Sequence, residues 1–185
     1  MKRFAIIASA AAFLCAAPAA RAQVQFGLAA GGNFPVGNSD NDLKTGYIAQ
    51  ASIWFQPAII PFGLVIDGAY SRWGYKGADG NARVIHGTLN GVFSGTPDMA
   101  FRPYITGGVG VYNFDESTSS TTAGVASTTE STGSVTKFGL NAGAGVSLPL
   151  SSVAVYAEAR YHYVFLNSQH FSMVPVVVGI KFGAF

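Results

Sequence analysis

The sequence predicts an all-β fold: an eight-stranded antiparallel up-and-down transmembrane β-barrel preceded by a cleavable signal peptide. Three observations support it: an apolar export segment at the N-terminus, 49% hydrophobic residues with only 11% charged ones, and eight segments rich in alternating apolar residues. Soluble domains carry about 25% charged residues. No stretch after the export segment has the length and continuous apolar character of a transmembrane helix. A closed barrel is the other structure that satisfies every backbone polar group inside a membrane.

The first 22 residues have the three-part plan of a secretory signal peptide. Two basic residues precede an apolar run over 4–17, and small residues flank the expected cleavage site after Ala22. The run is too short to cross a bilayer as a helix, which needs about 20 residues. We therefore expect a signal peptide over 1–22 and an outer membrane β-barrel domain over 23–185.

The mature chain lacks both cysteine and a strong net charge. The single cysteine, Cys15, lies inside the signal peptide behind Leu14, which is too large for a lipoprotein signal. Removal of the signal peptide leaves eight basic residues against nine acidic ones, a net charge near −1. Without a cluster of Lys and Arg, no nucleic-acid partner is expected.

Eight strand-like segments follow one another, and their number is even, as in bacterial single-chain barrels. The connections after the second, fourth and sixth segments are short and turn-like, whereas the others are longer and more polar. Short turns on one side and long loops on the other are typical of outer-membrane barrels, with both termini on the periplasmic side. The expected segments are 24–35, 45–56, 61–73, 82–95, 100–113, 135–149, 152–166 and 172–184.

Within a strand, every second residue points to the same face. The polar residues named at the end of this paragraph alternate with apolar ones in their segments, which predicts that they point into the barrel. Buried charges are costly unless they are paired, so we expect a closed network. Lys181 or Arg102 is the expected partner of Glu158, in preference to Arg160, which lies two residues along the same strand. A gated ion path is the alternative, although eight strands leave an interior just wide enough for side chains. The expected lumen residues are Asp67, His86, Asn90, Arg102, Asn141, Glu158, Arg160, His162 and Lys181.

Aromatic residues gather near both ends of the segments, where barrels place aromatic girdles at the membrane interfaces. Those expected near the long-loop end are Trp73, Tyr75, Tyr112, Phe114, Tyr161, Tyr163 and Phe165, and those expected near the short-turn end are Trp54, Phe55, Phe93, Phe101 and Phe182.

The segment from Asp115 to Ser134 is rich in Ser and Thr and has no apolar periodicity. This composition predicts a mobile external loop. It is either a solvated connection or a binding site for a surface ligand, and the simple connection is favoured.

Motifs for catalysis or metal binding are missing from the sequence. The histidines His86, His162 and His170 lack the spacing of a metal site. The glycine-rich stretch 107–110 is not followed by a helical pattern, which argues against a phosphate-binding loop. No Gly-x-Ser-x-Gly elbow occurs. No catalytic residue, metal site or cofactor is therefore expected.

The segment from Val174 to Phe182 resembles the closing strand of small outer membrane β-barrel proteins of the OmpA/OmpX-like superfamily, the outer membrane protein beta-barrel domain. Such chains typically end in an aromatic residue after an alternating, glycine-containing strand, which resembles the signal read by the barrel-assembly machinery. The corresponding residues are Gly179, Ile180, Phe182 and Phe185. Phe185 has the opposite parity from Phe182, so either phenylalanine is a candidate for the terminal position.

The resemblance implies a bacterial outer membrane location, with membrane lipid, the barrel-assembly machinery and periplasmic chaperones as partners. It also implies a charged lumen network. The expected function is non-enzymatic: a barrel that contributes to envelope integrity and displays surface loops. The alternatives are a narrow channel or a carrier of a small apolar ligand, and, more distantly, a lipid-modifying enzyme at the rim.

Overall fold

The computed structural model describes residues 22–37, 43–57, 61–76, 80–95, 100–120, 128–150, 152–166 and 169–183. The expected signal peptide, except for Ala22, and Phe185 lie outside these residues. Within the described chain, no helix is long and apolar enough to span a bilayer.

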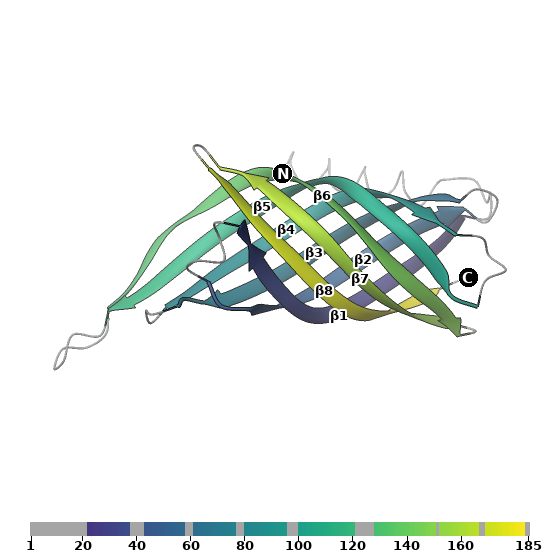
Figure 1. The fold of residues 1–185 in the computed structure, drawn as a ribbon, viewed down its shortest axis with the longest axis horizontal. Helices are drawn as coiled ribbons and strands as arrows, with labels where there is room; N and C mark the ends of the chain where they lie inside the picture. Colours follow the sequence, from purple (N-terminus) through teal and green to yellow (C-terminus); the bar gives the residue numbers. More distant parts are fainter. Residues whose placement is uncertain are drawn as a thin grey trace, which may run out of the picture.

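Eight antiparallel strands form a single closed barrel in sequence order, which confirms the predicted all-β, eight-stranded up-and-down architecture (Figure 1). Six strands begin and end within two residues of the predicted bounds at both ends, and the exceptions are the loop-facing ends of β5 and β6. The strands are β1 (Ala22–Val36), β2 (Gly46–Pro57), β3 (Phe62–Gly74), β4 (Gly80–Ser94), β5 (Arg102–Ser120), β6 (Thr128–Leu150), β7 (Val153–Phe165) and β8 (His170–Gly183).

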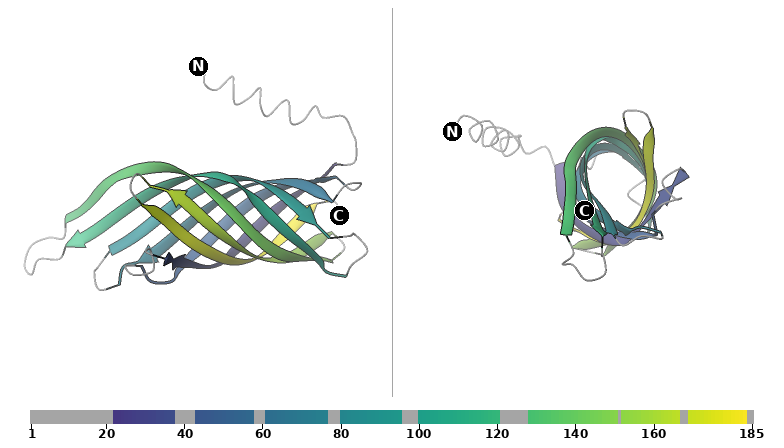
Figure 2. Two further views of the ribbon diagram at one scale, coloured as in Figure 1. Left: turned by 45° about the horizontal axis from the view of Figure 1, so that its top comes forward. Right: turned by 90° about the vertical axis from the view of Figure 1, so that its left-hand side faces the viewer.

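The barrel closes where β1 pairs with β8, from Gln25 opposite Gly183 to Val36 opposite Ser172. The ribbon seen along the barrel axis is a continuous ring (Figure 2). We call the rim that carries the β2–β3, β4–β5 and β6–β7 connections the turn end, and the opposite rim the loop end. Since the number of strands is even, β1 begins and β8 finishes at the turn end.

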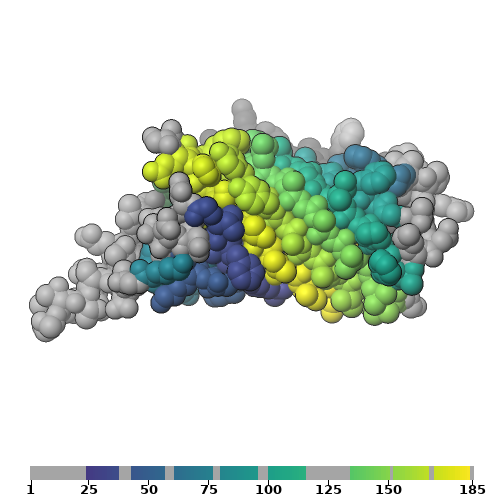
Figure 3. Space-filling model, viewed as in Figure 1, coloured from purple at the N-terminus to yellow at the C-terminus, as the bar shows by residue number. Residues whose placement is uncertain are grey.

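Side chains alternate between the lumen and the outer surface along each strand. In β3 the exposed and buried positions alternate almost without interruption from Phe62 to Gly74. The outward positions are mainly apolar, and Phe26, Leu28, Ile105 and Val178 are each more than half exposed. Figure 3 shows this outer surface over β1 and β5 to β8. The predicted parity of segments six to eight is confirmed, because the outward phase is apolar and exposed and the inward phase is buried.

The β5–β6 hairpin differs from the prediction. The segment from Asp115 to Ser134 was expected to be a loop, but paired strands continue to Ser120 and resume at Thr128. A register shift between Phe114 and Glu116 interrupts the pairing. Ser and Thr pair readily through their backbones, and Thr favours strands, so the absence of apolar alternation did not exclude a paired hairpin. This hairpin extends beyond the other strands at the loop end (Figures 1 and 2).

The predicted aromatic girdles are wrong for Trp54, Trp73 and Tyr112. Tyr75 and Phe114, also expected there, are partly buried against the inward cluster that contains Trp73 and Tyr112. Trp54, Trp73 and Tyr112 point into the lumen and are at most 1% exposed. Trp54 lies an even number of residues from the polar residues Gln50 and Ser52, which also face inward. This spacing in the sequence already indicated that Trp54 points into the lumen. Other aromatic residues do lie on the outer surface: Phe62, Phe93, Phe101 and Phe182 near the turn end, and Tyr47, Tyr161 and Phe165 near the loop end.

Candidate functional site

The lumen contains the polar residues that the parity argument selected. Arg102 is half-buried, whereas the other eight are no more than 6% exposed: Asp67, His86, Asn90, Asn141, Glu158, Arg160, His162 and Lys181. These and the other inward side chains lie in successive layers between the turn end and the loop end.

Arg160 lies at the centre of the lumen and bridges two carboxylates. Its guanidinium donates to Asp67 Oδ2 at 2.9 Å and to Glu158 Oε1 at 2.6 Å. Asp67 also accepts hydrogen bonds from Thr88 and Asn90, each at 2.9 Å. Residues of β3, β4 and β7 are thus joined across the barrel. We call Asp67, Thr88, Asn90, Glu158 and Arg160 the central cluster.

The expected partner of Glu158 was wrong. Neither Lys181 nor Arg102 forms an ion pair with it in the described chain, and Arg160 on the same strand does. Residues i and i+2 of a strand point to the same face about 7 Å apart, a distance that a long arginine side chain spans. Arg160 is also long enough to reach Asp67 on the far side of the lumen.

Lys181 occupies the layer toward the turn end, among three aromatic rings. Its ammonium lies 4.3 Å from the centroid of the Trp54 ring, and 5.6 and 5.5 Å from those of Tyr104 and Tyr156. Trp54 packs edge-on against both tyrosines. These distances are those of cation–π contacts, which stabilise a desolvated cation without a carboxylate. We call Trp54, Tyr104, Tyr156 and Lys181 the aromatic cage.

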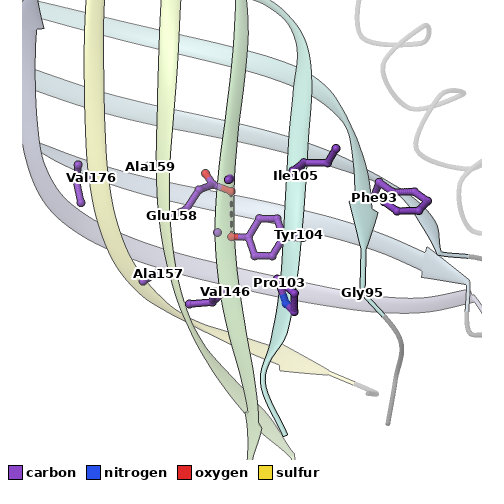
Figure 4. A pocket seen from close by; sticks show the side chains of 12 residues that line it. Phe93, Gly95, Pro103, Tyr104, Ile105, Val146, Ala157, Glu158, Ala159 and Val176 are labelled. Atoms are coloured by element: carbon purple, nitrogen blue, oxygen red, sulfur yellow. Dashed lines mark hydrogen bonds between the residues drawn. The ribbon is translucent and has the colours of Figure 1, made fainter. Parts of the chain in front are cut away.

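Tyr104 connects the aromatic cage to the central cluster. Its hydroxyl donates to Glu158 Oε2 at 3.0 Å. Figure 4 shows the two side chains, from β5 and β7, pointing toward each other across the intervening strand. That strand, β6, carries Gly145, where an added Cβ would lie 2.4 Å from the Tyr104 hydroxyl. The absence of a side chain at Gly145 therefore allows the contact to form.

Two histidines and a tyrosine fill the layer on the loop side of the central cluster. His162 Nδ1 lies 2.7 Å from the hydroxyl of Tyr112, and His86 stacks on the Tyr112 ring. Beyond them, Trp73 donates to the carbonyl oxygen of Asn33 at 3.1 Å. Large aromatic rings therefore lie on both sides of the central cluster.

An apolar groove of about 790 Å³ lies on the outer surface over β4 to β8. Outward side chains such as Ile105, Val146 and Val176 line it, and small residues, including Ala144 and Ala159, keep it shallow. Tyr104 and Glu158 lie behind this wall (Figure 4). A single strand layer therefore separates an apolar outer surface from the charged lumen.

The lumen side chains contact one another through ion pairs, hydrogen bonds and ring contacts. Within the described residues there is no group of three His, Cys, Asp or Glu side chains placed to hold a metal ion. Asn141 has the predicted orientation but makes no side-chain hydrogen bond with the described chain. The aromatic residues Trp54, Tyr104 and Tyr112 and the hydroxyl of Thr88 were missed as lumen residues that make specific contacts, and Tyr156 was placed in the inward phase of its segment but not among the interacting residues. The sequence did indicate an inward orientation for Tyr104 and Tyr156, because each lies two residues from a predicted lumen residue, Arg102 and Glu158 respectively.

A comparison with family models shows to which protein family the chain belongs. The family model for the outer membrane protein beta-barrel domain matches residues 6–182. The chain belongs to this family. Membership places it among the outer membrane β-barrel proteins of the OmpA/OmpX-like type, in agreement with the resemblance of its last strand. A search among curated proteins found no match.

Solved structures share the fold of this family member. Neisserial surface protein A matches with a TM-score of 0.63 at 12% identity, covering 87% of this chain and 97% of that one. A major outer membrane protein from Thermus thermophilus matches with a TM-score of 0.63 at 12% identity, covering 87% and 99%. The outer membrane enzyme PagL matches with a TM-score of 0.51 at 16% identity, covering 86% and 99%. At these identities the similarity establishes the architecture alone.

Proposed function

We propose that this protein is a non-enzymatic outer membrane barrel with a closed lumen, which contributes to envelope integrity and displays its loop-end hairpins at the cell surface. The observation that carries the proposal is the bridge from Arg160 to Asp67 and Glu158. It joins opposite walls of the barrel at mid-height and occupies the space that a conducting path would need.

Closure by side chains has a clear physical basis. Eight strands enclose an interior that side chains can fill, and here large rings lie on both sides of the central cluster. A hydrated ion crossing the lumen would have to displace Arg160 from two carboxylates. Breaking a buried ion pair leaves uncompensated charges and costs about 3–5 kcal/mol. The central cluster therefore favours a scaffold over a channel.

The proposal includes export and assembly. The signal peptide over 1–22 would direct the chain across the inner membrane, and periplasmic chaperones and the barrel-assembly machinery would insert it. Gly179, Ile180 and Phe182 in β8, together with Phe185, are the proposed assembly signal. The hairpin of β5 and β6 is the proposed contact for a surface ligand, and membrane lipid surrounds the outer face.

Conductance in planar lipid bilayers tests lumen closure. The purified protein should give no discrete conductance steps. A triple variant that replaces Asp67, Glu158 and Arg160 with alanine removes the bridge and should conduct. Arg72→Gln, which changes a charge on the outer surface, is the matched control and should stay silent. Stepwise conductance of the unaltered protein would favour the narrow channel instead.

A deletion strain tests the envelope role and the enzymatic alternative together. Loss of the gene should increase sensitivity to detergents and large antibiotics, while the chemical composition of the membrane lipids stays unchanged. An altered acylation pattern that active protein restores would overturn the non-enzymatic assignment. Extraction of a stoichiometric apolar compound from purified protein would favour a ligand carrier.

A further inference from the structure

Two arginines face each other on the outside of the barrel, where apolar residues prevail. Arg72 of β3 and Arg83 of β4 are register partners, and both are exposed. They have the parity of the outward residues Ile66, Ile85 and Leu89. The neighbouring strands β3 and β4 thus carry a pair of like charges on the surface that elsewhere faces lipid.

The same two strands carry a pair of phenylalanines near the turn end. Phe62 and Phe93 are register partners, with ring centroids 6.2 Å apart. Ten residues separate each phenylalanine from the arginine of its own strand. With a rise of about 3.3 Å per residue and a tilt near 40°, the two pairs lie about 25 Å apart along the barrel axis. This is about the height of the apolar band of outer membrane barrels.

The arginine pair therefore stands at the membrane interface of the loop end. Tyr47, the register partner of Arg72 on β2, is exposed there, and its ring lies 6.4 Å from that of Tyr70. Tyrosines at this position are typical of the boundary between hydrocarbon and headgroups. The guanidinium groups accordingly lie at the depth of lipid headgroups.

One carboxylate cannot balance two guanidinium groups. Arg83 forms an ion pair with Asp115, its register partner on β5. The side chain of Arg72 makes no ion pair or hydrogen bond within the described chain. Like charges placed directly opposite each other in a sheet are destabilising. A net positive charge thus remains on the row formed by Arg72, Arg83 and Asp115.

We propose that Arg72 and Arg83 bind the phosphate group of a membrane lipid in the leaflet at the loop end. The planar guanidinium groups present two N–H donors each to phosphate oxygens. Below them, Tyr70 and Ile85 offer an apolar surface along which the acyl chains of the same lipid can lie. A free phosphate ion would use only the charged half of this surface, which favours a lipid as the occupant.

Native mass spectrometry of the full mature barrel in zwitterionic detergent tests this site. The probes are phosphatidic acid and diacylglycerol with the same acyl chains, which differ only in the phosphate. Arg72→Gln and Arg83→Gln should each weaken phosphatidic acid binding about fivefold, the effect typical of one basic residue at an anionic membrane surface. Asp115→Asn should strengthen it, because Arg83 loses its competing carboxylate. Diacylglycerol binding should stay unchanged.

Lys76→Gln provides the matched control, because it removes an exposed positive charge at the loop end beyond the β3–β4 ladder. If Lys76→Gln weakens binding as much as Arg72→Gln does, the lipid responds only to the total positive charge of the protein, and the proposed site is wrong. Unchanged binding in both arginine variants would overturn it as well. Displacement of the lipid by an equal concentration of inorganic phosphate would show a site for the free anion instead. Gel mobility before and after heating verifies that each variant is folded.

Discussion

Two cations lie in neighbouring layers of the lumen, and different groups stabilise them. Arg160 binds two carboxylates, whereas Lys181 lies among three aromatic rings. The arginine and its partners depend on each other, because removal of the cation leaves two buried anions. The lysine can be removed without leaving an ion-paired carboxylate behind. The comparison predicts that two equally buried positive charges contribute unequally to stability.

Arg160→Met should give the largest effect. The methionine fills part of the volume but leaves Asp67 and Glu158 without a counterion, and a broken buried pair costs about 3–5 kcal/mol. Reversible urea unfolding in lipid vesicles measures the free energy of unfolding. A loss below about 1 kcal/mol would mean that water already solvates both carboxylates, and the two cations would then not differ as described.

Glu158→Ala should cost less than Arg160→Met, because Asp67 remains as a partner of the arginine. The change removes hydrogen bonds from Arg160 and Tyr104, and bonds to charged groups contribute about 1.5–3 kcal/mol. A double-mutant cycle with Arg160→Met should give a coupling of about 0.5–3 kcal/mol. Additive effects would contradict the pairing of these two residues.

Gly145→Ala should disturb the link between the two layers. The new Cβ would lie 2.4 Å from the hydroxyl of Tyr104 and 2.6 Å from the carbonyl oxygen of Ala157, so both the ring and the neighbouring backbone of β7 must shift. Overpacking of this kind costs about 1–3 kcal/mol. Tyr104→Phe keeps the ring and removes only the hydroxyl, and it separates the hydrogen bond from the crowding. An unchanged free energy of unfolding for Gly145→Ala would show that Tyr104 and the backbone at Ala157 both relax freely.

Lys181→Met should have the smallest effect, about 0.5–2 kcal/mol, because it removes cation–π contacts and keeps an apolar chain among the rings. The same urea unfolding assay measures the change. If this variant loses as much stability as Arg160→Met, then Lys181 neutralises the central cluster and both cations belong to one electrostatic unit.

Parity along the strands predicted the direction of the lumen side chains, because the two-residue period of a strand is local. The pairing of Glu158 with Arg160 was not predicted, because contacts inside a barrel depend on side-chain length and on closure across the lumen. Arg160 reaches Asp67, which lies 93 residues away in the chain. Likewise, Trp54 was assigned to an interface because of its residue type, although the parity of Gln50 and Ser52 indicated the lumen.

The β5–β6 hairpin shows that strands can also form where the sequence has no alternating pattern. Strand prediction relied on apolar alternation, which arises only where one face is apolar and the other polar. Beyond Phe114 the sequence shows no apolar alternation, yet the backbones remain paired from Glu116 opposite Thr132 to Ser120 opposite Thr128. Backbone pairing alone requires no periodic pattern in the sequence, because every residue except proline carries both a donor and an acceptor.

Because β1 pairs with β8, the ring of strands has no structural beginning or end. The chain could therefore start at another strand while the order of strands around the ring stays the same. β1 and β8 are paired over twelve register positions, from Gln25 opposite Gly183 onward, as closely as strands joined by a hairpin. A chain rejoined from Gly183 to Ala22 and opened between Ser120 and Thr128 would keep every ladder of the barrel. Such a circular permutant would begin with β6 and finish with β5. Its two ends would then lie together at the loop end, whereas the ends of the natural barrel lie at the turn end.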